Sequence, residues 1–176
     1  MNFDIHKKAS LIRLLALDLD GVLTDGRIYY GNHGDEIKAF DIQDGLGLVL
    51  LKKAGIPSVI ISGKKSAVNR RRAKELGIKR VIENCTNKKK SLMEVASRYK
   101  LGLEEICYIG DDLIDIPVLK YVGLAIAVQN AVEEVKQIAH YTTQKSGGRG
   151  AVREVTDMLI RGRGKWSEVC GVYLDA

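Results

Sequence analysis

The sequence is poor in cysteine, and it has no long apolar run. The three cysteines, Cys85, Cys107 and Cys170, show no spacing typical of a disulfide framework or a metal site, so we expect reduced thiols in a cytoplasmic protein. No apolar stretch approaches the length of a membrane span, and the opening MNFDIHKKAS lacks the apolar core of a signal peptide. We therefore expect no membrane partner.

Aromatic residues are also scarce, which bears on how the positive charge is interpreted. The formal net charge is +6, with basic clusters at 70–72, at 88–90 and at Arg161, Arg163 and Lys165. Such a surface can attract nucleic acid or a small anionic substrate. Because aromatics make up only 6% of the residues, base-stacking platforms are few. We favour a small anion and expect no nucleic-acid partner.

The length and the pattern of apolar runs predict one α/β domain. A chain of 176 residues, 45% of them hydrophobic, is long enough for one core. Short apolar runs alternate with amphipathic stretches, which favours a Rossmann-like, doubly wound parallel sheet with helices on both faces. We expect this domain over 1–161 and a flexible tail over 162–176. The predicted strands are 14–17, 58–61, 80–82, 106–109, 124–128 and 140–143, and the predicted helices are 45–54, 66–76, 88–99, 115–121, 131–138 and 151–160.

One segment interrupts this alternation. Residues 27–40 are typical of a β-hairpin, with IYY and IKAF arms around a Gly-Asn-His-Gly turn. A lone hairpin is marginal in water, so its apolar side chains favour assembly with other subunits. The alternative is that they pack on their own domain. The side chains concerned are Ile28, Tyr29, Ile37 and Phe40.

Polar residues follow several of the predicted strands, where a doubly wound sheet binds its ligands. We expect the fold to gather them at one edge of the sheet. Asp18 and Asp20 follow the first strand, Ser62 and Gly63 the second, and Asp111, Asp112 and Asp115 the fourth, while Lys88 begins the helix after the third.

These residue types suit phosphoryl transfer assisted by Mg²⁺. A carboxylate can attack phosphorus and form an aspartyl-phosphate, and we assign this role to Asp18. At Asp-Leu-Asp spacing, alternate side chains share a face, so Asp20 can protonate the leaving oxygen and then take a proton from water. Oxygen ligands hold Mg²⁺, and we expect them from Asp18, Asp20 and Asp111. Ser62 and Lys88 would bind the phosphoryl oxygens.

Each of these signals has an ordinary structural alternative. Acids are common at strand ends, and Asp111 and Asp112 could simply cap a helix. Lys88 could be one of three solvated lysines, and Ser62 could be a turn residue. The joint occurrence of all four signals, in this order and at these positions, favours the phosphoryl-transfer interpretation.

The same residues carry a resemblance to the haloacid dehalogenase superfamily of phosphohydrolases. The family motifs are matched by LDLDGVLTDG at 17–26, by VIISGK at 59–64, where Ser62 follows the apolar strand, by a lysine in CTNKKK at 85–90, and by GDDLID at 110–115. Lys88 fits the lysine motif best, although Lys89 or Lys90 could substitute. The hairpin region and the late GGRGAVREV segment resemble the cap-less phosphatases of 3-deoxy-D-manno-octulosonate 8-phosphate. Lys64 departs from that group, which usually has arginine there.

The resemblance implies a tetramer whose hairpins form a central barrel, and a role in lipopolysaccharide synthesis. Close relatives act on nine-carbon, sialic-acid-type 9-phosphates, so that substrate stays open. The substrate carries a carboxylate as well as a phosphate, which calls for a second cation. The candidate substrate-binding residues are Ser62, Gly63, Asp44, Arg72, Lys88 and Arg149, with Arg71 as a further candidate and the Gly147–Gly150 loop as a flexible cover.

The spacing of the motifs also favours the cap-less type, since the chain between Asp18 and Ser62 has room only for the hairpin and one helix. A neighbouring subunit would then close the open site. A different class of function, a phospho-accepting signalling domain, also combines acids with a lysine on such a sheet. That fold places its acceptor after the third strand and lacks the paired acids and the hairpin.

Overall fold

A six-stranded parallel sheet forms the centre of the computed structural model, which describes residues 3–174. The doubly wound sheet is confirmed, and all six predicted strands are present with small shifts at their ends. In spatial order the strands are β5 (Arg80–Ile82), β4 (Ser58–Ile61), β1 (Leu14–Leu17), β6 (Ile106–Gly110), β7 (Leu124–Ala127) and β8 (Tyr141–Thr142).

The central strand β1 explains why the sheet is covered on both faces. All four of its residues, Leu-Leu-Ala-Leu, are buried, as expected for a parallel strand between two layers of helices. Its last residue, Leu17, pairs with Ile60 on β4 and Ile109 on β6. The carboxyl ends of these three strands are therefore level, and the residues that follow them meet at one edge.

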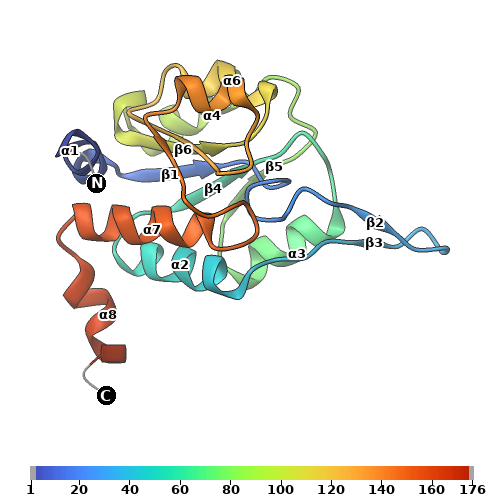
Figure 1. The fold of residues 1–176 in the computed structure, drawn as a ribbon, viewed down its shortest axis with the longest axis horizontal. Helices are drawn as coiled ribbons and strands as arrows, with labels where there is room; N and C mark the ends of the chain where they lie inside the picture. The colour runs from blue at the N-terminus through green and yellow to red at the C-terminus, as the bar shows by residue number, and fades with distance from the viewer. Residues whose placement is uncertain (1–2, 175–176) are drawn as a thin grey trace.

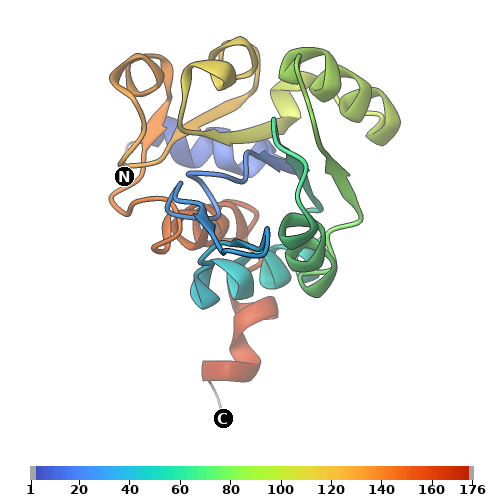
Figure 2. The ribbon, with the colours of Figure 1, turned by 90° about the vertical axis from the view of Figure 1, so that its right-hand side faces the viewer.

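Helices cover both faces of this sheet (Figures 1 and 2). The helices are α1 (Phe3–Leu11), α2 (Ile42–Lys53), α3 (Ala67–Glu75), α4 (Lys88–Tyr99), α5 (Ile116–Leu119), α6 (Glu133–Ile138), α7 (Ala151–Gly162) and α8 (Trp166–Leu174), with the 3₁₀ turns η1 (Leu103–Glu105) and η2 (Leu113–Asp115). Helices α2, α3 and α7 lie on one face, with α1 packed against α7, and α4, α5 and α6 lie on the other. Within residues 3–174, no helix is long and apolar enough to cross a membrane.

Side-chain caps set the helix starts. Asp41 precedes α2, and its carboxylate accepts hydrogen bonds from the backbone N–H groups of Gln43 and Asp44. This cap starts the helix at Ile42, three residues before the predicted start. Ser66 and Asn87 cap α3 and α4 in the same way.

The predicted hairpin is present but short, with strands β2 (Tyr29–Tyr30) and β3 (Glu36–Ile37). Gly34 adopts a φ of +82° in its turn, a conformation that glycine accepts readily. The hairpin projects away from the sheet (Figure 1). Tyr29 and Ile37 are 52% and 58% exposed, as is the neighbouring Tyr30 at 71%, so for these side chains the alternative of packing on their own domain is wrong within this chain. It is confirmed for Phe40, which is partly buried against the core, and Ile28 is half-buried.

Two terminal helices were not predicted. The segment expected as a loose tail forms α8, which buries Val169 and Cys170 against the domain, so the expected lack of regular structure there is wrong. At the other end, α1 buries Ile5 and Ala9, one turn apart. Both helices have few apolar anchors, and this weakens the periodic signal on which such predictions depend.

Candidate active site

The carboxyl edge of the sheet brings most of the predicted site residues together. Asp18 follows β1, Ser62 follows β4 and Asp111 follows β6, and they border a cavity of about 340 Å³. The cavity is lined by Asp18, Asp20, Gly26, Ser62, Gly63, Lys64, Asp111, Asp112 and Ile114.

Lys88 is the member of its lysine run that reaches the carboxylates. Its Nζ lies 2.8 Å from Asp18 Oδ2 and 2.8 Å from Asp115 Oδ1. Burial opposes the charge of Lys88, but the two carboxylates outweigh it and raise the pKa of the ammonium. Lys89 instead lies 3.5 Å from the centroid of the Tyr121 ring. The first position of α4 therefore supplies the cation.

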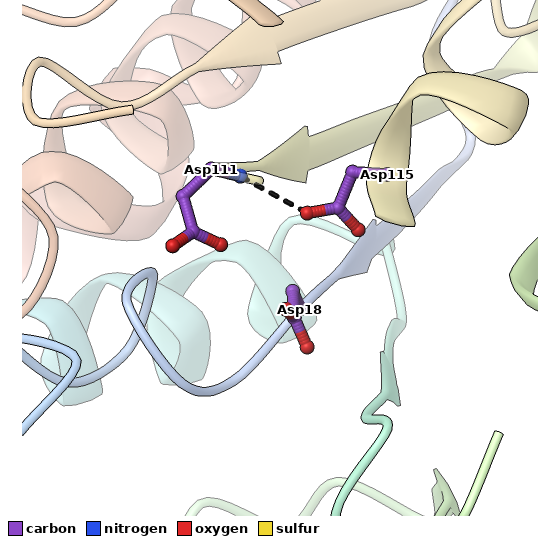
Figure 3. Close-up of side chains that lie close together, drawn as sticks. All are labelled: Asp18, Asp111 and Asp115. Carbon is purple, nitrogen blue, oxygen red and sulfur yellow. Dashed lines mark hydrogen bonds between the residues drawn. The ribbon is translucent and has the colours of Figure 1, made fainter. Parts of the chain in front are cut away.

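Asp115 holds this arrangement together. Besides the contact with Lys88, its carboxylate accepts a hydrogen bond of 2.6 Å from the Tyr108 hydroxyl. It also accepts one of 3.0 Å from the backbone N–H of Asp111, which Figure 3 shows. Its side chain is fully buried. The sequence placed Asp115 at this edge without assigning it a role, and Tyr108 was missed. The available signal was a lone aromatic residue inside a fully buried strand, Ile-Cys-Tyr-Ile-Gly.

Three carboxylates lie close enough to share a metal ion. Each of Asp18, Asp111 and Asp115 has an oxygen within 4.8 Å of the others (Figure 3). Burial, together with the charges of Asp18 and Asp115, raises the pKa of Asp111 to about 8. Burial likewise raises the pKa of Asp18 to about 6, although Lys88 opposes the shift. Among residues 3–174, the buried Oδ1 of Asp111 has no hydrogen-bond partner.

These features fit a hard divalent cation such as Mg²⁺, because all the donors are oxygen atoms and the negative charge is only partly offset. Asp18 and Asp111 are the ligands we expect, since both line the cavity, whereas Asp115 is fully buried and accepts hydrogen bonds at both of its oxygens. The carboxylate of Asp20, predicted as a further ligand, lies outside this group.

We expect Mg²⁺ binding to release protons. Ligand carboxylates must be ionised to bind the metal, yet the pKa of Asp111 is about 8 and that of Asp18 is about 6. Between these pH values the affinity should rise as pH rises, by up to about tenfold per unit where one proton is displaced. Calorimetric titration in two buffers of different ionisation enthalpy measures the protons released. An affinity that stays constant from pH 6 to 8 would contradict this.

Asp20 lines the cavity and contacts the residue that follows the second strand of the hairpin. Its side chain is 24% exposed, and its Oδ1 accepts a hydrogen bond of 2.6 Å from the Lys38 ammonium. Lys38, which follows β3, was not singled out in the sequence. Asp20 is thus held next to Asp18 but belongs to a different network from Lys88.

Ser62, Gly63 and Lys64 also line the cavity. The Ser62 hydroxyl donates to the carbonyl of Lys64 at 3.1 Å and accepts from its backbone N–H at 3.2 Å. This turn places Gly63 at the cavity wall. The Lys64 ammonium donates a hydrogen bond of 2.9 Å to the Tyr30 hydroxyl, so the position that departs from the resembling group joins the site to the hairpin.

Of the six predicted substrate-binding residues, Ser62 and Gly63 line this cavity and Lys88 contacts its lining residue Asp18, whereas the other three lie elsewhere in the described chain. Arg72 donates a hydrogen bond to the carbonyl of Asp41 and lies over the Phe40 ring. Arg149 is exposed in the glycine-rich loop. Asp44, in the first turn of α2, is fully buried against the start of α7. The further candidate, Arg71, pairs with Glu75 on the surface of α3.

Asp44 caps α7 across the interface with α2. Its carboxylate accepts hydrogen bonds from the backbone N–H groups of Gly150 at 3.2 Å and Arg153 at 2.7 Å. Burial raises its pKa to about 6, although these bonds oppose the shift. Asp44 therefore acts as a helix cap supplied by another element.

We expect Asp44→Ala to lower the free energy of unfolding by about 2–4 kcal/mol, because two buried N–H groups lose their acceptor. Asp157→Ala, on the same helix but partly exposed, should cost less than about 1 kcal/mol. Denaturant unfolding compares them. The raised pKa means that folded wild type takes up a proton at Asp44 as pH falls through about 6, before the unfolded chain does. Wild type therefore gains stability that Asp44→Ala cannot gain, and the difference in free energy of unfolding between the two should widen between pH 6 and 4. Equal losses in the two variants would contradict the cap.

The glycine-rich loop packs directly on the loop after β1. Gly148 donates a backbone hydrogen bond of 2.9 Å to Val22, and a Cβ on Gly147 would lie 1.8 Å from the Gly21 carbonyl oxygen. At Gly21, with φ of +89°, a Cβ would lie 2.0 Å from Asp111 Oδ2. These glycines allow close approach of backbone to backbone and to the carboxylate. They fix the loop in place, whereas composition had indicated a flexible cover.

Comparison with known proteins places this site in a family. Residues 64–155 match the profile of the haloacid dehalogenase-like hydrolases. The 3-deoxy-D-manno-octulosonate 8-phosphate phosphatase KdsC of Escherichia coli K12 is 43% identical, over 96% of this chain and 89% of that protein.

Two crystal structures of 3-deoxy-D-manno-octulosonate 8-phosphate phosphatases resemble the structure of this chain. The structure from Moraxella catarrhalis, in complex with magnesium, phosphate and KDO, has a TM-score of 0.94 at 40% identity and covers 97% of this chain and 98% of its own. The structure from Yersinia pestis has a TM-score of 0.92 at 41% identity, over 94% and 89%. The chain therefore belongs to the haloacid dehalogenase-like hydrolases and, within them, to the family of the 3-deoxy-D-manno-octulosonate 8-phosphate phosphatases.

Proposed function

We propose that this protein hydrolyses 3-deoxy-D-manno-octulosonate 8-phosphate to the free sugar acid and phosphate. The observation that carries the proposal is the cavity bordered by Asp18, Asp20 and Asp111, with Lys88 bound to Asp18 at 2.8 Å. The named activity of the KdsC relatives supplies the substrate.

In the first step, Asp18 attacks phosphorus while the bond from phosphorus to the sugar oxygen breaks. The backbone N–H of Leu19 donates to Asp18 Oδ1 at 2.7 Å, and Lys88 holds Oδ2, so the nucleophile is fixed before the substrate arrives. Asp20 gives a proton to the leaving sugar oxygen. Mg²⁺, held by Asp18 and Asp111, would offset the charge of the phosphoryl group.

In the second step, water attacks the aspartyl-phosphate. Asp20 now accepts a proton from that water, and the bond between Asp18 and phosphorus breaks to release phosphate. Lys88 and the Ser62 turn bind the phosphoryl oxygens. Asp20 ends the cycle protonated, as it began.

A phosphate-release screen tests the proposal. The purified protein with Mg²⁺ should prefer the eight-carbon sugar-acid 8-phosphate to nine-carbon 9-phosphates and to simple sugar phosphates by at least about tenfold in kcat/KM. A preference for a nine-carbon 9-phosphate would overturn the substrate assignment but would leave the assignment as a phosphatase intact. If no phosphate were released from any ester tested, the phospho-accepting signalling domain would be favoured, although the acceptor aspartate here follows β1 and not the third strand.

We also infer a homotetramer assembled through the hairpins, acting in the cytoplasm. Exposed Tyr29, Tyr30 and Ile37 support the assembly, and the free state of the three cysteines supports a reducing compartment. In sedimentation, Ile37→Lys should dissociate the assembly. Met93→Lys, at a side chain of similar exposure (53% against 58%) on α4, should leave it intact. A wild-type monomer at micromolar concentration would refute the assembly.

A further inference from the structure

A buried lysine at the base of the hairpin contacts the acid–base carboxylate. The side chain of Lys38 is 0% exposed. Its Nζ donates hydrogen bonds to Asp20 Oδ1 at 2.6 Å and Asn69 Oδ1 at 2.9 Å, and lies 3.2 Å from Glu36 Oε1. An ammonium withdrawn from water is destabilising unless it is paired. Three oxygen neighbours, from three different segments, provide that pairing.

The contact determines which oxygen of Asp20 is available. The ammonium occupies Oδ1, and within residues 3–174 the Asp20 side chain makes no other hydrogen bond. Asp20 lines the cavity, so Oδ2 is the atom left for the reactants. A carboxylate anchored through one oxygen loses most of its rotational freedom, and such orientation accelerates a proton transfer.

We propose that Lys38 is a positioning residue for Asp20, and that Asn69 fixes Lys38 in turn. The ammonium anchors Oδ1 so that Oδ2 delivers the proton to the leaving oxygen and later takes one from water. This inference rests on the role of Asp20 in the proposed function.

A purely architectural role would be to fasten the hairpin to the domain, but the hairpin has another attachment. Lys64 pairs with Glu36 at 3.5 Å and donates to Tyr30, without contacting Asp20. Lys38 differs because it is completely buried and because its shortest contact is the acid–base carboxylate. The geometry therefore points to the orientation of Asp20.

The test compares kcat/KM for p-nitrophenyl phosphate, whose leaving group needs little protonation, and phenyl phosphate, whose leaving group needs more. In Lys38→Met we expect about a 10- to 100-fold loss with phenyl phosphate and a clearly smaller loss with p-nitrophenyl phosphate. Asp20→Asn should show the same pattern more strongly, and the double variant should lose little beyond Asp20→Asn alone. Lys65→Met, at an exposed lysine outside the cavity, is the control and should match wild type.

Equal losses with both substrates, or no loss, would overturn the proposal. If Lys38→Met does not fold, Asn69→Ala decides the question by the same criterion, since it keeps the charge pair and removes the second anchor. The aryl phosphates do not depend on the identity of the sugar. A wild-type protein that hydrolyses them but not the sugar-acid phosphate would refute the substrate assignment and leave the role of Lys38 open to the same measurement.

Discussion

Asp18→Asn should abolish turnover while leaving a folded protein. The amide is a poor nucleophile and a weaker metal ligand, so we expect kcat to fall on the order of 10⁴-fold or more. The fold should survive, because the change removes one of three neighbouring negative charges and leaves Lys88 paired with Asp115. Phosphate release measures the loss, and circular dichroism checks the fold.

The role of Asp18 as nucleophile can be tested directly in the wild-type enzyme. The oxygen of the attacking water ends in phosphate on both routes, because the bond that breaks in the second step joins Asp18 to phosphorus, so the discriminating measurement is the stereochemistry at phosphorus. With a phosphorothioate substrate made chiral by oxygen isotopes and hydrolysed in isotopically labelled water, two successive in-line displacements through Asp18 should give net retention of configuration. A single direct attack by water would give inversion, and inversion would exclude the aspartyl-phosphate.

Lys88→Met should be the second most damaging change. The Lys88 side chain is 2% exposed and holds Asp18 and Asp115, so its loss leaves buried carboxylates without their cation. We expect a destabilisation of about 3–5 kcal/mol and a loss of activity of about 10²–10³-fold, as for other groups that stabilise charge in the transition state.

Magnesium should restore part of the lost stability in Lys88→Met, because the ion offsets the same negative charge. The melting temperature of this variant should therefore rise more steeply with Mg²⁺ concentration than that of wild type. Lys90→Met, two residues along α4 at an exposed side chain, should behave as wild type in both measurements. If Lys88→Met retained its activity, the assignment of the site lysine would be wrong.

Much of the fold was predictable, because strands such as β1 and β4 are buried on both faces and so appear as continuous apolar runs. Their carboxyl ends could then be aligned without a structure, which placed Asp18, Ser62 and Asp111 at one edge. Lys88 was predictable as the first residue of a helix. These are features in which local sequence determines position.

The remaining site residues depend on contacts that local sequence does not encode. Lys38 reaches Asp20 only because the hairpin folds back, and Tyr108 reaches Asp115 across a 3₁₀ turn. Asp44 was predicted to bind substrate, but its carboxylate instead accepts hydrogen bonds from the start of α7, from residues more than 100 positions away in the sequence. Buried polar pairs of this kind require the tertiary structure.

The contact between the glycine-rich loop and the loop after β1 bears on when the enzyme can first become active. Gly148 binds Val22 through a backbone hydrogen bond, so a segment from late in the chain supports one from its beginning. During synthesis from the N-terminus, the residues around Asp18 leave the ribosome early but gain this support only after Gly148 has emerged. Such long-range closure slows folding, and we expect nascent chains shorter than this to lack phosphatase activity even when β1 has already paired with β4.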